Sequence, residues 1–392
     1  MTSDIIEREQ AALFQTYRRL PLVIERAEGV RITTQDGSVY LDFLGGIAVN
    51  ALGHSHPRLV QAVVDQVHRY MHVSNFFYQE PQVQLAERLK KFSGFDRVFF
   101  TNSGTESTEA AVKLARRFGS QTGRYDVVGF TGGFHGRTYA ALSVMDKPLY
   151  KEGMGPFLPN TLVLPYNDVD ALEARIDDST CAVMLECIQG EGGISSASDE
   201  FIQAVLELKQ RYGFLIIADE VQAGIGRTGD FFSYERYGFK PDIVTIAKSM
   251  GGGLPLGAVL ATESVASLWD KGMHGTTYGG NAVACAAGNV VLEELEHGLL
   301  QHVREVGDYL HTQLVDVAAS APDKIREIRG RGLMKGIVVD GDAAPYVTAL
   351  RERFVITNVT AGNVIRLVPP YVITTADVDE FISVLTEVIR SL

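Results

Sequence analysis

The stretch CAVMLECIQGEGGISSASDEFIQAVLELKQRYGFLIIADE, residues 181–220, decides the fold class. It contains two mostly apolar runs of strand length, residues 181–186 and 214–220. Between them, residues 199–213 carry apolar side chains at helical spacing, begin with two acidic residues and end at a glycine. A strand, a helix and a second strand in this order predict a parallel β-α-β unit.

The same alternation continues on both sides of this stretch. A β-prone run at 97–102 precedes an amphipathic helix at 105–119, and further apolar runs of strand length are 125–130, 161–166, 242–248 and 257–262. Such strands, separated by helices, are typical of a mostly parallel sheet covered on both faces. We therefore predict an α/β fold whose large domain spans residues 51–290.

The two ends of the chain differ from this pattern. Residues 28–43 predict a hairpin with its turn at Asp36-Gly37, and residues 281–298 predict a long helix that ends at Gly298. Beyond it, 335–340 and 364–374 are strand-like, and helices are expected near 343–354 and 376–392. The sequence thus predicts a small α+β domain over 291–392, joined by an N-terminal segment, residues 1–50.

Composition and charge exclude several classes of protein. The 392 residues carry a formal charge of −12, which argues against a nucleic-acid surface or an anionic membrane as partner. No apolar run reaches the ~18 residues of a membrane span, and the charged N-terminus lacks a signal peptide. The three cysteines form no CxxC pair, which predicts a reducing cytoplasm. His54 and His56 lack further ligands at set spacings, so we expect no metal.

One glycine motif imitates a nucleotide-binding fingerprint. Residues 224–229 match GxGxxG, but four residues separate them from the preceding strand, and no convincing long helix follows. The acid nearest to the required distance of ~20 residues, Asp242, starts a strand, whereas a dinucleotide site needs an acid at a strand end. We therefore do not expect a nicotinamide cofactor.

The chemically informative residues lie at strand ends. Asp219 ends one predicted strand, Lys248 ends the next, and Ser103-Gly104-Thr105 opens a helix directly after a third. Ligands of open α/β sheets bind at this edge. A helix N-terminus favours a phosphate, a desolvated lysine attacks carbonyls, and an aspartate can hold a ring nitrogen protonated. Together they describe a site for pyridoxal 5′-phosphate.

Each of these groups also has a structural explanation. Asp219 could cap a turn, Lys248 could be a surface lysine after an edge strand, and Ser103 could simply cap its helix. Spacing alone leaves both interpretations open.

The motifs themselves resemble a known family, the class III pyridoxal-phosphate aminotransferases of fold-type I. They are NSGTES (102–107), GGFHGRT (132–138), ECIQGEGG (186–193), ADEVQAGIGRTG (218–229), TIAKSMGGGLPLGA (245–258), HGTTYGGN (274–281) and NVIRLVPP (363–370). They occur in the family's order and span nearly the whole chain. Residues 40–57, 331–337 and 358–370 are most similar to the acetylornithine aminotransferases.

The resemblance implies a role for five residues around the cofactor ring. Lys248 would form the Schiff base and shuttle the proton, and Asp219 would pair with the pyridine nitrogen. Val221 and Phe134 would pack on the two ring faces, and Gln222 would meet the phenolic oxygen.

It also implies how the phosphate is held. Gly104 and Thr105 would bind it through their backbone amides. Thr277 would reach the phosphate of the neighbouring subunit's cofactor, which makes a homodimer the catalytic unit, and Thr276 would touch the substrate.

Two arginines would recognise carboxylates, since guanidinium groups bind them in a bidentate manner. By resemblance, Arg366 would bind the α-carboxylate of glutamate, Arg137 would take the carboxylate farther from the reacting amine, and Glu191 would mask Arg366 until glutamate arrives. The alternatives are a structural ion pair for Arg366 and a backbone contact for Arg137. Glu186 lies nearby, with no defined role.

Three positions bear on the family pattern. Cys187 stands where relatives usually have proline, and TESTEAA (105–111) replaces the usual T-E-A-N-E-A-A. Tyr17 stands where ornithine δ-aminotransferases use a tyrosine to grip the substrate's α-carboxylate, which leaves the amino donor open.

The resemblance implies a cytoplasmic enzyme of arginine biosynthesis that moves the δ-amino group of N2-acetyl-L-ornithine to 2-oxoglutarate. Alternative donors are ornithine, succinylornithine, succinyldiaminopimelate, 4-aminobutyrate and a carrier-linked lysine precursor. An aminomutase of the same fold is disfavoured, because two arginines suit an exchange between two carboxylate substrates. A cofactor-binding regulator is disfavoured by the intact Lys248 and Asp219.

Overall fold

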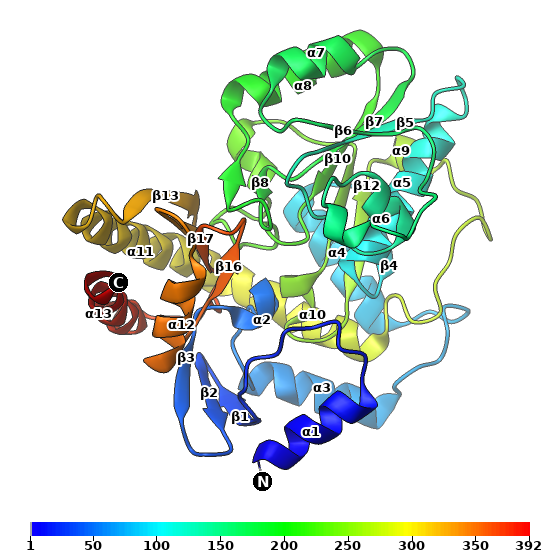
Figure 1. The fold of residues 1–392 in the computed structure, drawn as a ribbon. Coiled ribbons are helices and arrows are strands. Elements are labelled where there is room, and N and C mark those ends of the chain that lie inside the picture. The colour runs from blue at the N-terminus through cyan, green and yellow to red at the C-terminus, as the bar shows by residue number, and fades with distance from the viewer. Residues whose placement is uncertain (1) are drawn as a thin grey trace.

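The centre of the protein is a seven-stranded sheet, seen in a computed structural model that describes residues 2–392 (Figure 1). Its strands lie in the order β4-β12-β11-β10-β7-β5-β6. In that order they span Arg97–Thr101, Gly257–Ala261, Ile243–Ile246, Leu215–Asp219, Thr180–Leu185, Asp126–Phe130 and Thr161–Leu164. Only β12 runs antiparallel to its neighbours, so the prediction of a mostly parallel sheet is confirmed.

Helices cover both faces of this sheet, and consecutive strand residues alternate between two apolar clusters. Ile217 belongs to the cluster built around α5 (Gly104–Gly119). Its neighbour Ile216 belongs to the cluster that includes α8 (Asp199–Tyr212). Side chains of a strand point to opposite faces in turn, so a strand buried on both sides must be apolar throughout. This explains why the strands read as continuous apolar runs.

Three further helices pack together beside the sheet: α3 (Pro57–Arg69), α4 (Glu80–Ser93) and α10 (Ala282–Glu294). Pro57 at the first helical position suits the start of α3, because its missing N–H is not needed there. Gly94 closes α4 in the left-handed conformation, with φ of 66°. Leu85 and Leu89 of α4 are buried in the larger apolar cluster.

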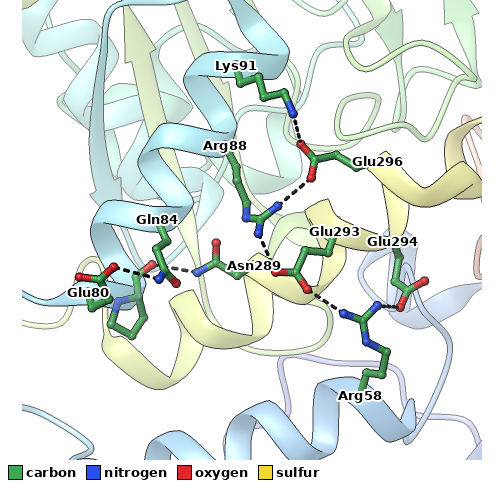
Figure 2. Close-up of polar contacts among 10 residues, drawn as sticks. Arg58, Glu80, Gln84, Arg88, Lys91, Asn289, Glu293, Glu294 and Glu296 are labelled. Atoms are coloured by element: carbon green, nitrogen blue, oxygen red, sulfur yellow. Dashed lines mark hydrogen bonds and ion pairs between the residues drawn. The ribbon is translucent and has the colours of Figure 1, made fainter.

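A chain of ion pairs joins these three helices (Figure 2). Glu293 lies between Arg58 and Arg88, with N–O distances of 2.7 Å to each. Arg88 also pairs with Glu296 at 2.7 Å, and Lys91 pairs with the other oxygen of Glu296 at 2.9 Å. Single surface pairs contribute only ~0.2–1 kcal/mol, but this network fixes the helices in register with one another.

The helix is interrupted at Gly298, as predicted. α10 spans Ala282–Glu294, and in the turn over Leu295–Leu299 both His297 and Gly298 have non-helical dihedral angles, with φ of 113° at Gly298. α11 then follows at once over Leu300–Ser320. The 21-residue α11 was not predicted.

The N-terminal strands β1 (Ile24–Glu28), β2 (Arg31–Thr34) and β3 (Val39–Asp42) form an antiparallel sheet, with the predicted turn at Asp36-Gly37. β15 (Val355–Ile356) adds to β3 in parallel. A strand from near the end of the chain thus completes the sheet begun at its start.

The small α+β part contains a second four-stranded sheet, in the order β13-β14-β17-β16. These strands span Ile325–Arg331, Met334–Val339, Val364–Leu367 and Asn358–Thr360. α11, α12 (Ala344–Glu352) and α13 (Thr375–Ser391) pack near it (Figure 1). The domain boundaries at residues 50 and 290 stay a prediction.

The remaining elements are short, apart from the N-terminal helix α1. They are α1 (Thr2–Ala12), α2 (Gly45–Ala48), α6 (Tyr139–Ser143), α7 (Val169–Arg175), α9 (Glu263–Ala266), β8 (Ile188–Gln189) and β9 (Ser195–Ser196). Over residues 2–392, no helix has the length and apolar character that a membrane crossing requires.

Candidate active site

A cavity of about 470 Å³ lies at the carboxyl edge of the central sheet. It gathers the ends of β4, β10 and β11 with the loop at 134–137, as the strand-end argument predicts. The predicted site residues that line it are Gly104, Thr105, Phe134, Arg137, Asp219, Val221 and Lys248.

Asp219 is held in place by a histidine. Its side chain is 2% exposed, and its Oδ2 lies 2.7 Å from Nδ1 of His135, which is also buried. Its Oδ1 accepts a hydrogen bond of 3.0 Å from the backbone N–H of Val221. The carboxylate is therefore oriented and paired in a place where an unpaired charge would be costly.

Lys248 follows β11 in an unusual backbone conformation. Its φ of 45° is in the left-handed region, which L-residues seldom adopt. Burial, together with the nearby charge of Arg366, lowers the pKa of its amine to about 8. A fraction of the amine is therefore neutral near pH 7 and able to attack a carbonyl or accept a proton.

The N-terminus of α5 is built for an anion. Ser103 caps it by accepting the N–H of Glu106, while the N–H groups of Gly104 and Thr105 have no hydrogen-bond partner within residues 4–392. A Cβ at Gly104 would lie 2.7 Å from Cγ1 of Val221, so only glycine lets the helix approach that side chain.

Thr105 also organises the neighbouring loop. Its hydroxyl accepts the backbone N–H groups of Arg137 and Thr138, each at 3.2 Å, and pairs with the Thr138 hydroxyl at 2.8 Å. The loop passes close enough that a Cβ at Gly136 would meet the Thr105 hydroxyl at 2.2 Å. The helix N-terminus and the loop that carries Arg137 are thus locked together.

Arg366 lies on β17 and is 1% exposed. One of its terminal nitrogens pairs with Oε1 of Glu191, and its Nε donates to Oδ1 of Asn358 at 3.1 Å. Burial opposes the charge of Glu191, but Arg366 outweighs it and lowers the pKa of that carboxyl. The pairing of Arg366 and Glu191 is present in the structure, whereas its role as a gate stays a prediction.

Gln222 and Glu186 take other partners within the chain. Oε1 of Gln222 accepts from Arg366 at 3.1 Å, so its side chain is tied to the arginine. Glu186 accepts the backbone N–H of Phe134 at 3.2 Å. Burial and the charge of Asp219 raise the pKa of Glu186 well above its ordinary value. Glu186 thus supports the loop that carries Phe134.

Arg137 is exposed and rests on an aromatic side chain. Its guanidinium lies 3.6 Å from the ring centre of Tyr150 and 5.7 Å from that of Phe134. The two rings meet edge to face, with centres 6.0 Å apart. This stacking leaves the guanidinium available at the mouth of the cavity.

Six predicted residues do not line the cavity: Arg366, Glu191 and Gln222, described above, and Thr276, Thr277 and Tyr17. Thr276 is connected to it, because its hydroxyl accepts from the side chain of Asn102, a lining residue, at 3.2 Å. Thr277 is exposed, and Tyr17 is 72% exposed in the N-terminal segment. Within one described chain, neither Thr277 nor Tyr17 reaches the site.

Comparison with known proteins gives the family of this architecture. The family model for class-III aminotransferases matches residues 13–389. The chain belongs to the class-III aminotransferase family. It is 42% identical over 380 residues to an acetylornithine aminotransferase of Aquifex aeolicus, which covers 96% of this chain and 99% of that one. It is 45% identical to the enzyme of the same name from Agrobacterium fabrum, over 94% of each chain.

Solved structures of class-III aminotransferases have the same fold. The ornithine aminotransferase of Toxoplasma gondii superposes with a TM-score of 0.94 at 29% identity, over 100% of this chain and 95% of that one. An acetylornithine aminotransferase of Elizabethkingia anophelis superposes with a TM-score of 0.89 at 32% identity, over 100% and 99%.

Pyridoxal 5′-phosphate is the cofactor of class-III aminotransferases, and the residues present fit it. The unpaired N–H groups at the start of α5 suit its phosphate. The buried Asp219 and the amine of Lys248 suit its ring nitrogen and its aldehyde.

Other features singled out in the sequence are structural. The turn over 224–229 holds the fully buried Arg227, whose guanidinium donates to the carbonyl groups of Leu333 and Pro369. All three cysteines are buried and free. Nε2 of His54 lies 2.8 Å from Oδ2 of Asp42.

His135 and Tyr150 belong to the site, although the sequence did not predict them as site residues. His135 lies inside the quoted motif GGFHGRT, so its adjacency to Phe134 was visible, but its partner lies 84 positions away. Tyr150 ends a short turn over Pro148–Tyr150, and no sequence signal connects it with Arg137.

Proposed function

We propose that this aminotransferase moves the δ-amino group of N2-acetyl-L-ornithine to 2-oxoglutarate, giving N-acetylglutamate 5-semialdehyde and L-glutamate. The reaction belongs to arginine biosynthesis. Relatives 40–45% identical over nearly the whole chain carry the name acetylornithine aminotransferase, which supports this choice of donor.

The observation that carries the proposal is the ion pair between the buried Arg366 and Glu191, whose side chain is 27% exposed. An enzyme that takes a terminal amine from one substrate and returns an α-amine to another must hide its α-carboxylate site from the first. Glu191 neutralises Arg366 while acetylornithine reacts. Glutamate and 2-oxoglutarate displace Glu191 with their own carboxylate, which binds the same guanidinium.

Asp219 and Lys248 are the two residues that act directly in the reaction. When bound, pyridoxal phosphate supplies the electron sink that lets an amine and a carbonyl exchange. The Asp219 carboxylate, fixed by His135, would hold a proton on the cofactor's ring nitrogen. The Lys248 amine, with its pKa lowered to about 8, takes a proton from the substrate carbon on one side and returns it on the other.

Arg137 binds the carboxylate that lies farther from the reacting amine. It is exposed at the mouth of the cavity, so it can receive the α-carboxylate of acetylornithine or the distal carboxylate of glutamate. Arg366, which is buried and paired with Glu191, receives only the α-carboxylate of glutamate and 2-oxoglutarate. One site thereby accommodates two carboxylate substrates of different length.

The active unit in this proposal is a homodimer. An exposed aromatic surface, made of Phe76, Phe77, Tyr78 and Tyr278, is 61–103% exposed in the single chain. Such a patch is typical of a protein interface. Asn75 ties this surface to the 276–279 loop by donating to the carbonyl groups of Thr276 and Gly279 at 3.2 and 3.1 Å. Thr277 then faces the partner's cofactor.

The protein acts in the cytoplasm in this proposal. The three cysteines are buried and unpaired, which suits a reducing compartment.

A panel of amino donors tests the proposed substrate. The kcat/KM values for acetylornithine, succinylornithine, ornithine, succinyldiaminopimelate and 4-aminobutyrate are measured with 2-oxoglutarate as acceptor. Acetylornithine is expected to have the highest value. A higher value for ornithine would assign the chain to the activity named for the Toxoplasma gondii structure, and would overturn the proposal.

A further inference from the structure

A second cavity, also of about 470 Å³, lies between α11, the turn that joins β13 to β14, and residues 228–230. It is on the other face of the small sheet from Arg366. In the register of β14 and β17, Gly336 is opposite Arg366 and Lys335 is opposite Leu367. Because consecutive strand residues point to opposite faces, Lys335 points away from the side of Arg366.

Lys335 is a buried cation that makes fewer hydrogen bonds than its ammonium can donate. It is 3% exposed, in a strand whose other residues are all buried. Its ammonium makes one hydrogen bond within residues 4–392, to the carbonyl of Gly330 at 3.3 Å, and no carboxylate of that part of the chain lies within 4.0 Å. An ammonium has three donors, so two remain. Burial lowers the pKa of Lys335 to about 8, and most of it is still charged at pH 7.

The other groups of this cavity are also mostly donors. Nδ1 of His311 is buried and has no partner among the described residues. Arg304 and Arg331 lie on the same wall and share one carboxylate, Asp230, at 3.6 and 3.4 Å. Asp308 is the second carboxylate of the lining, so three formal positive charges face two negative ones.

We propose that this cavity is a second binding site, for a small oxyanion, either a carboxylate or a phosphate. Such a ligand supplies acceptors for the two remaining donors of Lys335 and for Nδ1 of His311 in the tautomer that carries its proton there. It also adds a partner for the two arginines that have one carboxylate between them. A cation is disfavoured by the excess positive charge. The inference does not depend on the amino donor.

A ligand here would contact elements that also serve the active site. Residues 228–230 continue the segment that carries Val221 and Gln222, and the Leu333 N–H donates to the Arg227 carbonyl at 3.0 Å. The strand with Lys335 is paired with the strand that carries Arg366. The two sites are therefore distinct, but they are connected through the paired strands β14 and β17 and the segment 221–230.

Calorimetric titration of the cofactor-loaded protein tests the proposal, with inorganic phosphate and acetate as separate probes. Loading occupies the phosphate site at α5, so that phosphate binding there does not interfere. Lys335→Met keeps the length of the side chain and removes the charge. Lys271→Met, at an exposed position, removes the same charge elsewhere.

At least one probe is expected to bind the wild type, and its affinity is expected to fall at least tenfold in Lys335→Met and to be unchanged in Lys271→Met. The probe that binds tells whether the site prefers phosphate or carboxylate. Arg331→Gln, which keeps Lys335, is expected to weaken binding as well, so a folding defect of the first variant would not hide the result. Equal isotherms for wild type and both cavity variants, or no binding of either probe to wild type, would overturn the proposal.

Discussion

The side chains of His135 and Asp219 form a buried pair, with Nδ1 of the histidine 2.7 Å from Oδ2 of the aspartate. The pair joins the loop after β5 to the end of β10, two strands that β7 separates in the sheet. Asp219 can hold a proton on the cofactor only if its carboxylate keeps this orientation. His135 is therefore a positioning residue for Asp219.

Replacing His135 should lower activity without touching the substrate. His135→Ala removes a hydrogen bond to a charged group, worth about 1.5–3 kcal/mol, so kcat should fall roughly 10- to 100-fold. Affinity for the cofactor should fall as well, while the KM for 2-oxoglutarate stays near the wild-type value. Steady-state kinetics and cofactor titration measure these values. His68→Ala on the exposed face of α3 serves as the control, and equal losses in both variants would contradict the positioning role.

Lys248→Ala should abolish turnover while the fold persists. The amine is the proposed proton carrier, and general acid–base groups contribute ~10²–10⁴-fold to a rate. We expect at least that loss in transamination, with an unchanged far-ultraviolet circular dichroism spectrum. Borohydride should fix the cofactor onto Lys248 in the wild type only, as peptide mass spectrometry reads out. Transamination retained in Lys248→Ala would refute the role of this lysine.

Glu191→Ala tests the proposed masking of Arg366. With the carboxylate gone, Arg366 should bind carboxylates without competition, so the half-reaction with glutamate should gain over that with acetylornithine. A change of about 1–3 kcal/mol corresponds to a shift of roughly 5- to 150-fold in the ratio of the two kcat/KM values. Single-turnover spectra measure each half-reaction separately. Unchanged rates would dismiss the gate; Glu327→Ala, an exposed carboxylate, is the control.

Lys335 should make stability depend on pH. Burial lowers its pKa in the folded state to about 8, below the ordinary value of 10.5. Between these two values the unfolded chain binds more protons, so the free energy of unfolding rises with pH, and below pH 8 the full cost of burial remains. In a buffer without small oxyanions, Lys335→Met should therefore stabilise the protein at pH 7, by at most about 3 kcal/mol.

This gain should shrink as the pH rises from 8 towards 10.5, where the wild-type lysine is neutral in both states. Melting temperatures of wild type, Lys335→Met and Lys271→Met across this range give the comparison. A gain that does not change with pH would mean that packing, and not charge, is responsible.

The exposed aromatic surface should govern assembly. Phe76→Ser and Tyr78→Ser remove side chains that are 93% and 103% exposed in one chain. If they are central to the interface, each change should raise the dimer dissociation constant at least about tenfold, as interface anchors do. Sedimentation velocity over a dilution series measures this. Val315→Ser, which removes an exposed apolar side chain on α11, should leave the dimer intact, and a wild type that sediments as a monomer would reject the assembly.

The central sheet could be predicted because its five inner strands are buried on both faces. Continuous apolar runs such as 214–219 indicate a buried strand, and the helix at 199–213 begins with two acidic residues and ends at Gly213. The break at Gly298 could also be predicted, because a glycine with positive φ usually ends a helix. The helix α11, which follows at once and packs against the small sheet, was not predicted.

The site was predictable only where a residue's neighbours along the chain determine its place. Asp219 and Lys248 follow directly from the strand ends, and the N-terminus of α5 follows from its strand. His135 contacts Asp219, and Tyr150 contacts Arg137, only in the folded protein. No pattern in the sequence predicts either contact. The side chain of Gln222 accepts a hydrogen bond from the buried guanidinium of Arg366, a contact that also forms only in the folded protein.

The sheet shared by both ends of the chain has a consequence for biosynthesis. β3 has its parallel partner in β15, more than 300 residues later, and the ring of Phe43 stacks on that of Phe381 with centres 4.2 Å apart. During translation the first 43 residues leave the ribosome long before these partners exist. One edge of the N-terminal hairpin therefore stays unpaired until β15 has been made. Emergence of residues 355–381 from the ribosome, and not emergence of the hairpin itself, sets the moment at which this part of the enzyme can assemble.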